Sequence, residues 1–300
     1  CEVRGRAERV WQTCERRGER SMKDIYYVNS NNERIDLLKS PYMLQTGELF
    51  NSSWSYESKD RIGGGAKITS IRKKLEERSL ILSIVNYGPD SYEQAVDHLH
   101  EVLDIDVLNQ AHGRLYVVEM YIECYVIASK KSEWEYDAEY MDVELTVVLE
   151  NPMWIGKNAY TFHSYGITSS DNKRYPGSYP YRYANGLSSN YIINPHFTDA
   201  NFQLIIYGPV VNPQVTIGST PYLVNIVLEE GEYLIIDSRS ETITKVMNKG
   251  ERINAFHNRQ KGRKFFQKIP PGRQLIAWTG KFDFDLIIFE ERGEPRWKSQ

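Results

Sequence analysis

Short apolar runs cut by regular turn signals most constrain what this chain can form. Residues 201–237 read NFQLIIYGPVVNPQVTIGSTPYLVNIVLEEGEYLIID, and Gly-Pro, Asn-Pro and Glu-Gly pairs separate the apolar runs. Short apolar runs bounded by turn residues are typical of antiparallel strands. The segment therefore predicts a ladder of short strands joined by tight turns.

The same pattern extends over the last third of the chain, without any helical period. It predicts strands at Phe202–Tyr207, Gln214–Ile217, Tyr222–Leu228, Tyr233–Asp237, Thr242–Met247, Lys264–Ile269, Gln274–Thr279 and Phe282–Phe289. Many short strands at this spacing favour a β-sandwich over residues 191–300.

Residues 22–153 predict a β-rich domain with one flanking helix. Ser91-Tyr92-Glu93-Gln94 is a capping box, in which the Ser91 and Gln94 side chains satisfy free amides at a helix start. Apolar residues then recur at helical spacing, at Tyr92, Ala95, Val96, Leu99, Val102 and Leu103. Strands are expected at Ile25–Val28, Arg78–Asn86, Leu115–Ala128 and Met141–Glu150. The expected fold class is mainly β.

Length supports a division into two domains. The chain has 300 residues, more than one domain usually contains. From Trp154 to Asn190 the strand pattern gives way to Gly, Ser, Asn, Pro and Tyr, so a connection is expected over 154–190. No segment approaches the roughly 20 apolar residues of a membrane helix, and no membrane partner is expected.

The first 21 residues differ in composition from the rest. They contain six Arg, four Glu and two of the three cysteines. Met22 directly precedes a strand-like segment, so we hypothesise that Met22 is the natural start and that 1–21 is a translated upstream leader. Intact-mass measurement on protein from its native source should give a chain that begins at Met22; a native chain that retains Cys1 would reject the hypothesis.

The residues that carry chemistry form no recognisable site. Six histidines are scattered, Cys124 sits in an apolar strand pattern typical of a small buried hydrophobe, and no Gly-x-Ser-x-Gly elbow occurs. Acidic pairs two residues apart, such as Asp283 and Asp285, share a strand face by geometry alone. A glycosidase pair is defined by separation in space, so these pairs do not by themselves predict one. We expect no catalytic residue, metal or cofactor.

Three surface segments are candidates for binding. The polar stretch Tyr56–Ala66 ends in a glycine triplet that suits an excursion from the fold, and no Gly-Lys-Ser/Thr follows to make it a phosphate loop. Four tyrosines could present a sugar-binding surface, although rings packed onto a sheet are the simpler interpretation: Tyr175, Tyr179, Tyr181 and Tyr183. A basic group could meet an acidic partner or simply protect a strand edge: Arg259, Lys261, Arg263 and Lys264.

The order of several motifs resembles that of siphophage distal tail proteins. In the second half these are Tyr207-Gly208-Pro209, Asn212-Pro213, the strand Gly231–Asp237, and Ile269-Pro270-Pro271-Gly272. In the first half they are Pro41-Tyr42-Met43-Leu44 with Gly47, the glycine excursion, the single helix and the Val143–Pro152 strand, and near the end Arg292–Trp297. The likeness runs from Met22 to the end of the chain.

The resemblance implies a structural baseplate hub component at the tip of a phage or prophage tail, and no enzyme. It implies a ring-forming first domain and a galectin-like sandwich, with six copies to a ring and two such rings back to back. The implied partners are the tail tube and a tail-associated lysin or fibre protein, with DNA only as passing cargo. Such a protein is made in the bacterial host cytoplasm and resides in the virion tail tip.

Within this family interpretation the excursion is the candidate contact between subunits, through Glu57, Lys59, Arg61, Gly63, Gly64 and Gly65. A cyclic head-to-tail interface closes when the rotation between subunits divides a full turn. The alternative function is carbohydrate recognition by the sandwich, which would hold the virion on a host cell-wall glycan.

Overall fold

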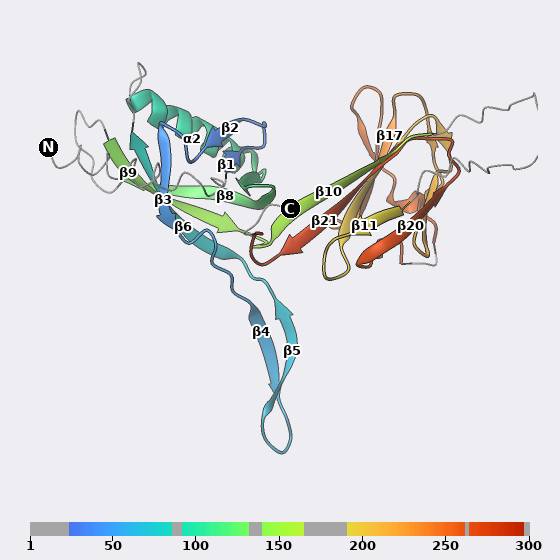
Figure 1. The fold of residues 1–300 in the computed structure, drawn as a ribbon, viewed down its shortest axis with the longest axis horizontal. Coiled ribbons are helices and arrows are strands. Elements are labelled where there is room, and N and C mark those ends of the chain that lie inside the picture. Colours follow the sequence, from blue (N-terminus) through green and yellow to red (C-terminus); the bar gives the residue numbers. More distant parts are fainter. Residues whose placement is uncertain (1–23, 86–91, 132–139, 165–190, 262–263, 297–300) are drawn as a thin grey trace, which may run out of the picture. The chain divides into compact units, whose positions relative to one another are not determined.

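The computed structural model describes residues 24–85, 92–131, 140–164, 191–261 and 264–296. They divide into two compact units: unit 1 holds the described residues up to Ile155 together with residues 292–296, and unit 2 spans Gly156–Glu291. Strands dominate both units, and α2 is the one α-helix within the described ranges (Figure 1). The prediction of a mainly β fold with a single flanking helix is confirmed.

Unit 1 is an antiparallel sheet with α2 packed on one face. Its strands pair in the order β2-β1-β7-β8-β9-β6-β3, and α2 contacts β8, β6 and β2. Its elements are β1 (Ile25–Val28), β2 (Arg34–Asp36), β3 (Tyr42–Gly47), β4 (Ser55–Asp60), β5 (Ala66–Arg72), β6 (Glu76–Val85), α2 (Tyr92–Asn109), β7 (Gly113–Val117), β8 (Met120–Lys131) and β9 (Tyr140–Leu149). The core lies between the helix and the sheet.

The helix follows the predicted apolar spacing. Its buried residues are Ala95, Leu99, Val102, Leu103 and Asp106, one face of a helix with 3.6 residues per turn. The helix begins at Tyr92, and the capping residue Ser91 lies outside the described residues.

A buried carboxylate fixes the end of this helix to the sheet. Asp106 is fully buried and accepts hydrogen bonds from the Tyr27 hydroxyl at 2.5 Å and the Ser30 amide at 2.7 Å. Burial is the largest cause of a raised pKa of Tyr27, and Asp106 raises it further, so the phenol stays protonated and donates. At Gly113 a Cβ atom would lie 1.9 Å from the Tyr27 hydroxyl oxygen, so only glycine fits beside this pair.

Unit 2 consists of two facing antiparallel sheets that share one core. One sheet has the order β19-β18-β17-β12-β21-β10, the other β11-β20-β14-β15, and β13 pairs with β16. Its elements are β10 (Trp154–Phe162, with Trp154 and Ile155 in unit 1), β11 (Tyr191–Asn194), β12 (Asn201–Tyr207), β13 (Val210–Val211), β14 (Gln214–Ile217), β15 (Thr220–Leu223), β16 (Val227–Leu228), β17 (Tyr233–Asp237), β18 (Thr242–Val246), β19 (Arg252–Asn254), η1 (Phe256–Asn258), β20 (Gly272–Trp278) and β21 (Phe284–Arg292).

The turn motifs that signalled this unit pack against each other. The Gly208 amide donates to the Glu232 carbonyl at 2.9 Å, and a Cβ at Gly208 would lie 2.1 Å from the Glu229 carbonyl oxygen. The Glu232 carboxylate accepts from the Glu229 amide at 2.8 Å and pairs with Lys245 Nζ at 2.7 Å. The backbone bond from Glu229 is the larger cause, and Lys245 the next, of a lowered pKa of Glu232.

The structure differs from the predicted strands at four places. The run Leu115–Ala128 is two strands, because a turn at Val118, with φ of 57°, separates β7 from β8. The run Tyr222–Leu228 is likewise divided between β15 and β16. Lys264–Ile269 is no strand: Ile269 forms an isolated bridge to Ala200, and the apolar side chains in this loop fill the core. The expected connection over 154–190 begins with β10, whose Trp154 is fully buried.

Replacement of Asp106 by Asn should destabilise the protein by about 2–3 kcal/mol, because an amide cannot accept from both Tyr27 and Ser30 and leaves a buried donor unpaired. Urea unfolding measures the change. The control Asp104→Asn alters an exposed carboxylate on the same helix and should stay within about 0.5 kcal/mol of the parent. Equal effects of the two substitutions would contradict the assigned role of Asp106.

Replacement of Glu232 by Gln should flatten the acid dependence of unfolding. A carboxylate with a lowered pKa contributes stability above its unfolded pKa of about 4.3, and this is lost as the pH falls through the folded value. Thermal unfolding between pH 6 and roughly pH 3 measures the slope. The control Glu230→Gln, at an exposed neighbouring residue, should retain the pH dependence of the parent. The same pH dependence in Glu232→Gln as in the parent would refute the contribution assigned to Glu232.

Candidate functional site

The predicted excursion is a β-hairpin that leaves the body of unit 1. β4 and β5 pair antiparallel with each other and with no other strand, and make their extensive contacts only with each other among the described elements (Figure 1). The glycine triplet forms the tip: Gly63, Gly64 and Gly65 have φ of 108°, 104° and 78°, values that other residues adopt only with strain. The Arg61 amide closes the turn on the Gly65 carbonyl at 2.8 Å.

One face of the hairpin is apolar and uncovered. Tyr56 lies directly opposite Ile71, and Ile68 opposite Ser58, with Tyr56, Ile68 and Ile71 exposed by 66, 53 and 60%. Residues three apart on a regular strand point to opposite faces, but a register shift between Glu57 and Ser58 inserts one extra residue in β5. Ile68 and Ile71 therefore share a face.

Further apolar side chains are exposed at both ends of the hairpin. Ile62 at the tip is fully exposed, and Trp54 and Leu75 at the base are exposed by 55 and 59%. Lys73 Nζ lies 4.9 Å from the centroid of the Trp54 ring and donates to Ser52 Oγ at 2.9 Å. Scattered exposed apolar residues are normal, but a contiguous set on one ribbon marks an interaction surface.

The opposite face of the hairpin is charged and mostly basic. Arg72 pairs with Glu57, whereas Lys59 and Lys67 lie directly opposite each other, a like-charge arrangement that disfavours the pair. Within the described part of the chain, no ion pair joins Lys59, Arg61 or Lys67 to another residue. The structure thus brings all six predicted residues of the excursion together on one arm, three in or beside its strands and three at its tip.

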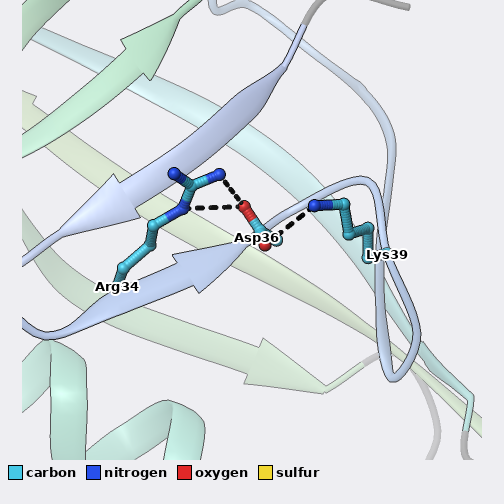
Figure 2. A network of polar contacts seen from close by, with 3 residues as sticks. All are labelled: Arg34, Asp36 and Lys39. Carbon is cyan, nitrogen blue, oxygen red and sulfur yellow. Dashed lines mark hydrogen bonds and ion pairs between the residues drawn. The ribbon is translucent and has the colours of Figure 1, made fainter.

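A basic cluster elsewhere in unit 1 shows the contrast. Figure 2 shows Arg34 and Lys39 on either side of Asp36, with Arg34 Nε 2.9 Å from Oδ1 and Lys39 Nζ 3.2 Å from Oδ2. Partial burial opposes ionisation of Asp36, but the hydrogen bonds from Arg34 and Lys39 outweigh it and hold the pKa of Asp36 below its ordinary value. Arg34 also lies 3.7 Å from the centroid of the Tyr26 ring. Arg34 and Lys39 thus form ion pairs within the fold, unlike Lys59, Arg61 and Lys67 of the hairpin.

The other two candidate surfaces are only partly described. All four tyrosines of the proposed sugar surface lie outside the described residues, as does Arg263. Arg259 is half-buried: its guanidinium carbon lies 3.6 Å from the centroid of the Phe256 ring and one of its nitrogens donates to the Phe256 carbonyl at 2.7 Å. Lys261 and Lys264 are exposed.

Among the described residues, the cysteine thiol and the potential metal ligands form neither a reactive nucleophile nor a metal site. Cys124 is buried, and burial raises the pKa of its thiol to about 12, so the thiolate needed for nucleophilic attack is not formed at neutral pH. Among the described residues no group of three or more His, Cys, Asp or Glu is placed to hold a metal ion. None of the described helices has the length and apolar character that a membrane span requires.

Comparison with solved structures finds the same fold in phage hub and baseplate proteins. The crystal structure of the SPP1 Dit protein, described as a paradigm of the hub adsorption apparatus in phages of Gram-positive hosts, matches with a TM-score of 0.53 and 12% identity, over 90% of this chain and 99% of that one. A chain of the phage P2 baseplate in its activated conformation with Ca matches with a TM-score of 0.57 and 12% identity, over 92% of this chain and 100% of that one.

The phage P2 baseplate with Sr gives the same TM-score at 13% identity and the same coverage. No protein-family model and no curated protein matches the sequence. The structural neighbours of the chain are therefore phage tail hub and baseplate proteins, related to it by fold along nearly its whole length.

Proposed function

We propose that this chain is a structural hub protein at the tip of a long non-contractile phage or prophage tail. Copies of it form a ring through unit 1, six to a ring, and the ring joins the tail tube to the tail-associated lysin or fibre protein. Unit 2 is a galectin-like sandwich displayed outward. The fold shared with hub and baseplate proteins over nine-tenths of the chain supports this assignment.

The observation that carries the proposal is the uncovered hairpin. A two-stranded hairpin is marginally stable in water, and this one also exposes Tyr56, Ile68 and Ile71 on one face. Covering these side chains against a neighbouring subunit removes apolar surface from water at about 25 cal/mol per Å². An arm that reaches from each copy to the next supplies the head-to-tail contact that a cyclic ring requires.

The proposal assigns a scaffold role and no turnover of substrate. The thiol of Cys124 is buried in the core of unit 1, and three carboxylates accept hydrogen bonds within the fold: Asp106 from the Tyr27 hydroxyl, Asp283 from the Ser164 amide and Asp285 from the Tyr207 hydroxyl. The four tyrosines predicted for carbohydrate recognition lie outside the described residues, so that function is not proposed.

Removal of the arm should abolish self-assembly without unfolding the protein. Tyr56 and Ile71 are register partners, so residues 57–70 can be replaced by Asn-Gly, a two-residue turn that suits a hairpin. Light scattering should then give the mass of a monomer where the parent gives that of a ring, with an unchanged thermal midpoint because the arm packs on no core.

A point variant separates the apolar face from the length of the arm. Tyr56→Ser, Ile68→Ser and Ile71→Ser together should also yield a monomer, whereas the same change at three exposed apolar residues of unit 2, Val211, Val227 and Leu275, should leave the ring intact. An oligomer that survives loss of the arm would refute the proposed ring contact.

A further inference from the structure

We infer that the outer face of helix α2 is the surface that receives the basic, apolar arm of a neighbouring copy. This rests on the proposed function, which requires only that the arm touch a neighbour, and it names the place of that contact. Two independent properties of α2, its charge and its exposed apolar end, carry the inference.

The exposed face of α2 is a continuous acidic stripe. It contains Glu93, Asp97, Glu101 and Asp104, spaced by four, four and three residues, which places all four within about a third of the helix circumference. The helix contains no Lys or Arg, and none of the four carboxylates forms an ion pair with a described residue. Lys131 lies beside the helix, where its Nζ atom contacts His100 Nε2 at 3.1 Å.

This stripe disfavours the helix that bears it. Like charges four residues apart repel, and carboxylates toward the C-terminal end add to the negative end of the helix dipole, where no basic residue is present. A cationic partner along the stripe would offset both the repulsion between the carboxylates and their unfavourable interaction with the helix dipole. The helix therefore presents a surface that gains from a basic ligand.

The stripe ends in exposed apolar side chains. Val107 and Leu108 are exposed by 41 and 80%, and Leu108 lies one turn beyond Asp104 on the same side. A simple cation would satisfy the carboxylates but leave these two side chains in water. The surface instead fits a partner that is both basic and apolar.

The hairpin of the same chain has this combination of properties. It carries Lys59, Arg61 and Lys67 without internal ion pairs, and Ile62 exposes an apolar side chain next to Arg61 at the tip. The arm spans about 20 Å from Tyr56 to its tip, and α2 is about 27 Å long, so the arm can lie along most of the stripe.

The contact is between copies and not within one chain. Within unit 1 the hairpin runs away from α2 (Figure 1), and the two share no extensive contact. One surface on the arm and a different one on the helix make a heterologous interface, the type that closes into rings. A second copy of this chain is therefore the occupant to which charge and apolar complementarity point.

Charge reversal and its rescue test this docking. Glu101→Lys with Asp104→Lys, or Lys59→Glu with Lys67→Glu, should each weaken self-association of the full chain roughly tenfold or more, because like charges then meet across the interface. A mixture of the two variants should recover at least part of the parent affinity through its arm-to-helix contacts, and the quadruple variant should recover it fully. Sedimentation velocity over a concentration series measures each association.

Matched controls change the same net charge elsewhere. Glu230→Lys with Glu251→Lys, and Lys249→Glu with Lys281→Glu, alter exposed residues of unit 2 and should associate as the parent does. The thermal midpoint of each variant reports folding, and the helix variant should be at least as stable as the parent because its new lysines suit the helix dipole.

The outcomes separate this inference from the proposed function. Assembly lost on removal of the arm but unaffected by the charge reversals would overturn the α2 contact and leave the ring proposal standing. Assembly weakened by both reversals without rescue in the quadruple variant would also overturn it, since the two sets of charges would then act at separate places. Assembly that survives removal of the arm would overturn both.

Discussion

An antiparallel strand pair with one apolar face needs a further layer to cover that face, and this constraint governs both units. In unit 1 the helix α2 covers the sheet, and in unit 2 the two sheets cover each other. The hairpin β4–β5 lacks such a layer within the described chain. Under the proposed function a neighbouring copy covers this face, and for that reason the hairpin carries the functional argument.

The two cores also decide which parts of the surface are free to bind. Asp106 and Tyr27 fix one face of α2 to the sheet, so the acidic face is turned outward and held there. The hairpin is anchored through β3 and β6, whose pairing with each other and with β9 continues the same sheet. The two surfaces assigned to assembly thus both belong to unit 1.

The sequence predicted the elements whose burial follows a regular period. The helix was predictable from Ala95, Leu99 and Val102, and the sandwich strands from their alternation and from turns such as Gly208-Pro209. The turn at Val118 was not predictable, because no Gly, Pro or Asn marks it between two apolar runs. The predicted strand Lys264–Ile269 was wrong because its apolar residues have another role. Phe265 and Ile269 anchor a loop to the core, and this loop forms no regular strand.

The candidate site was predictable in position but not in character. The glycine triplet predicted an excursion from the fold, and in the structure the triplet forms the tip of a hairpin. The apolar face escaped prediction because the bulge shifts Ile68 into line with Ile71, and a bulge leaves no fixed sequence signal. The acidic stripe of α2 was present in the sequence as the spacing of Glu93, Asp97, Glu101 and Asp104.

Electron microscopy of the purified chain tests the central claim most directly, because it images the symmetry of the assembly. The account predicts closed rings of six copies, joined through unit 1, that disappear when residues 57–70 are removed. Particles of single chains at every concentration, or open filaments in place of rings, would contradict it.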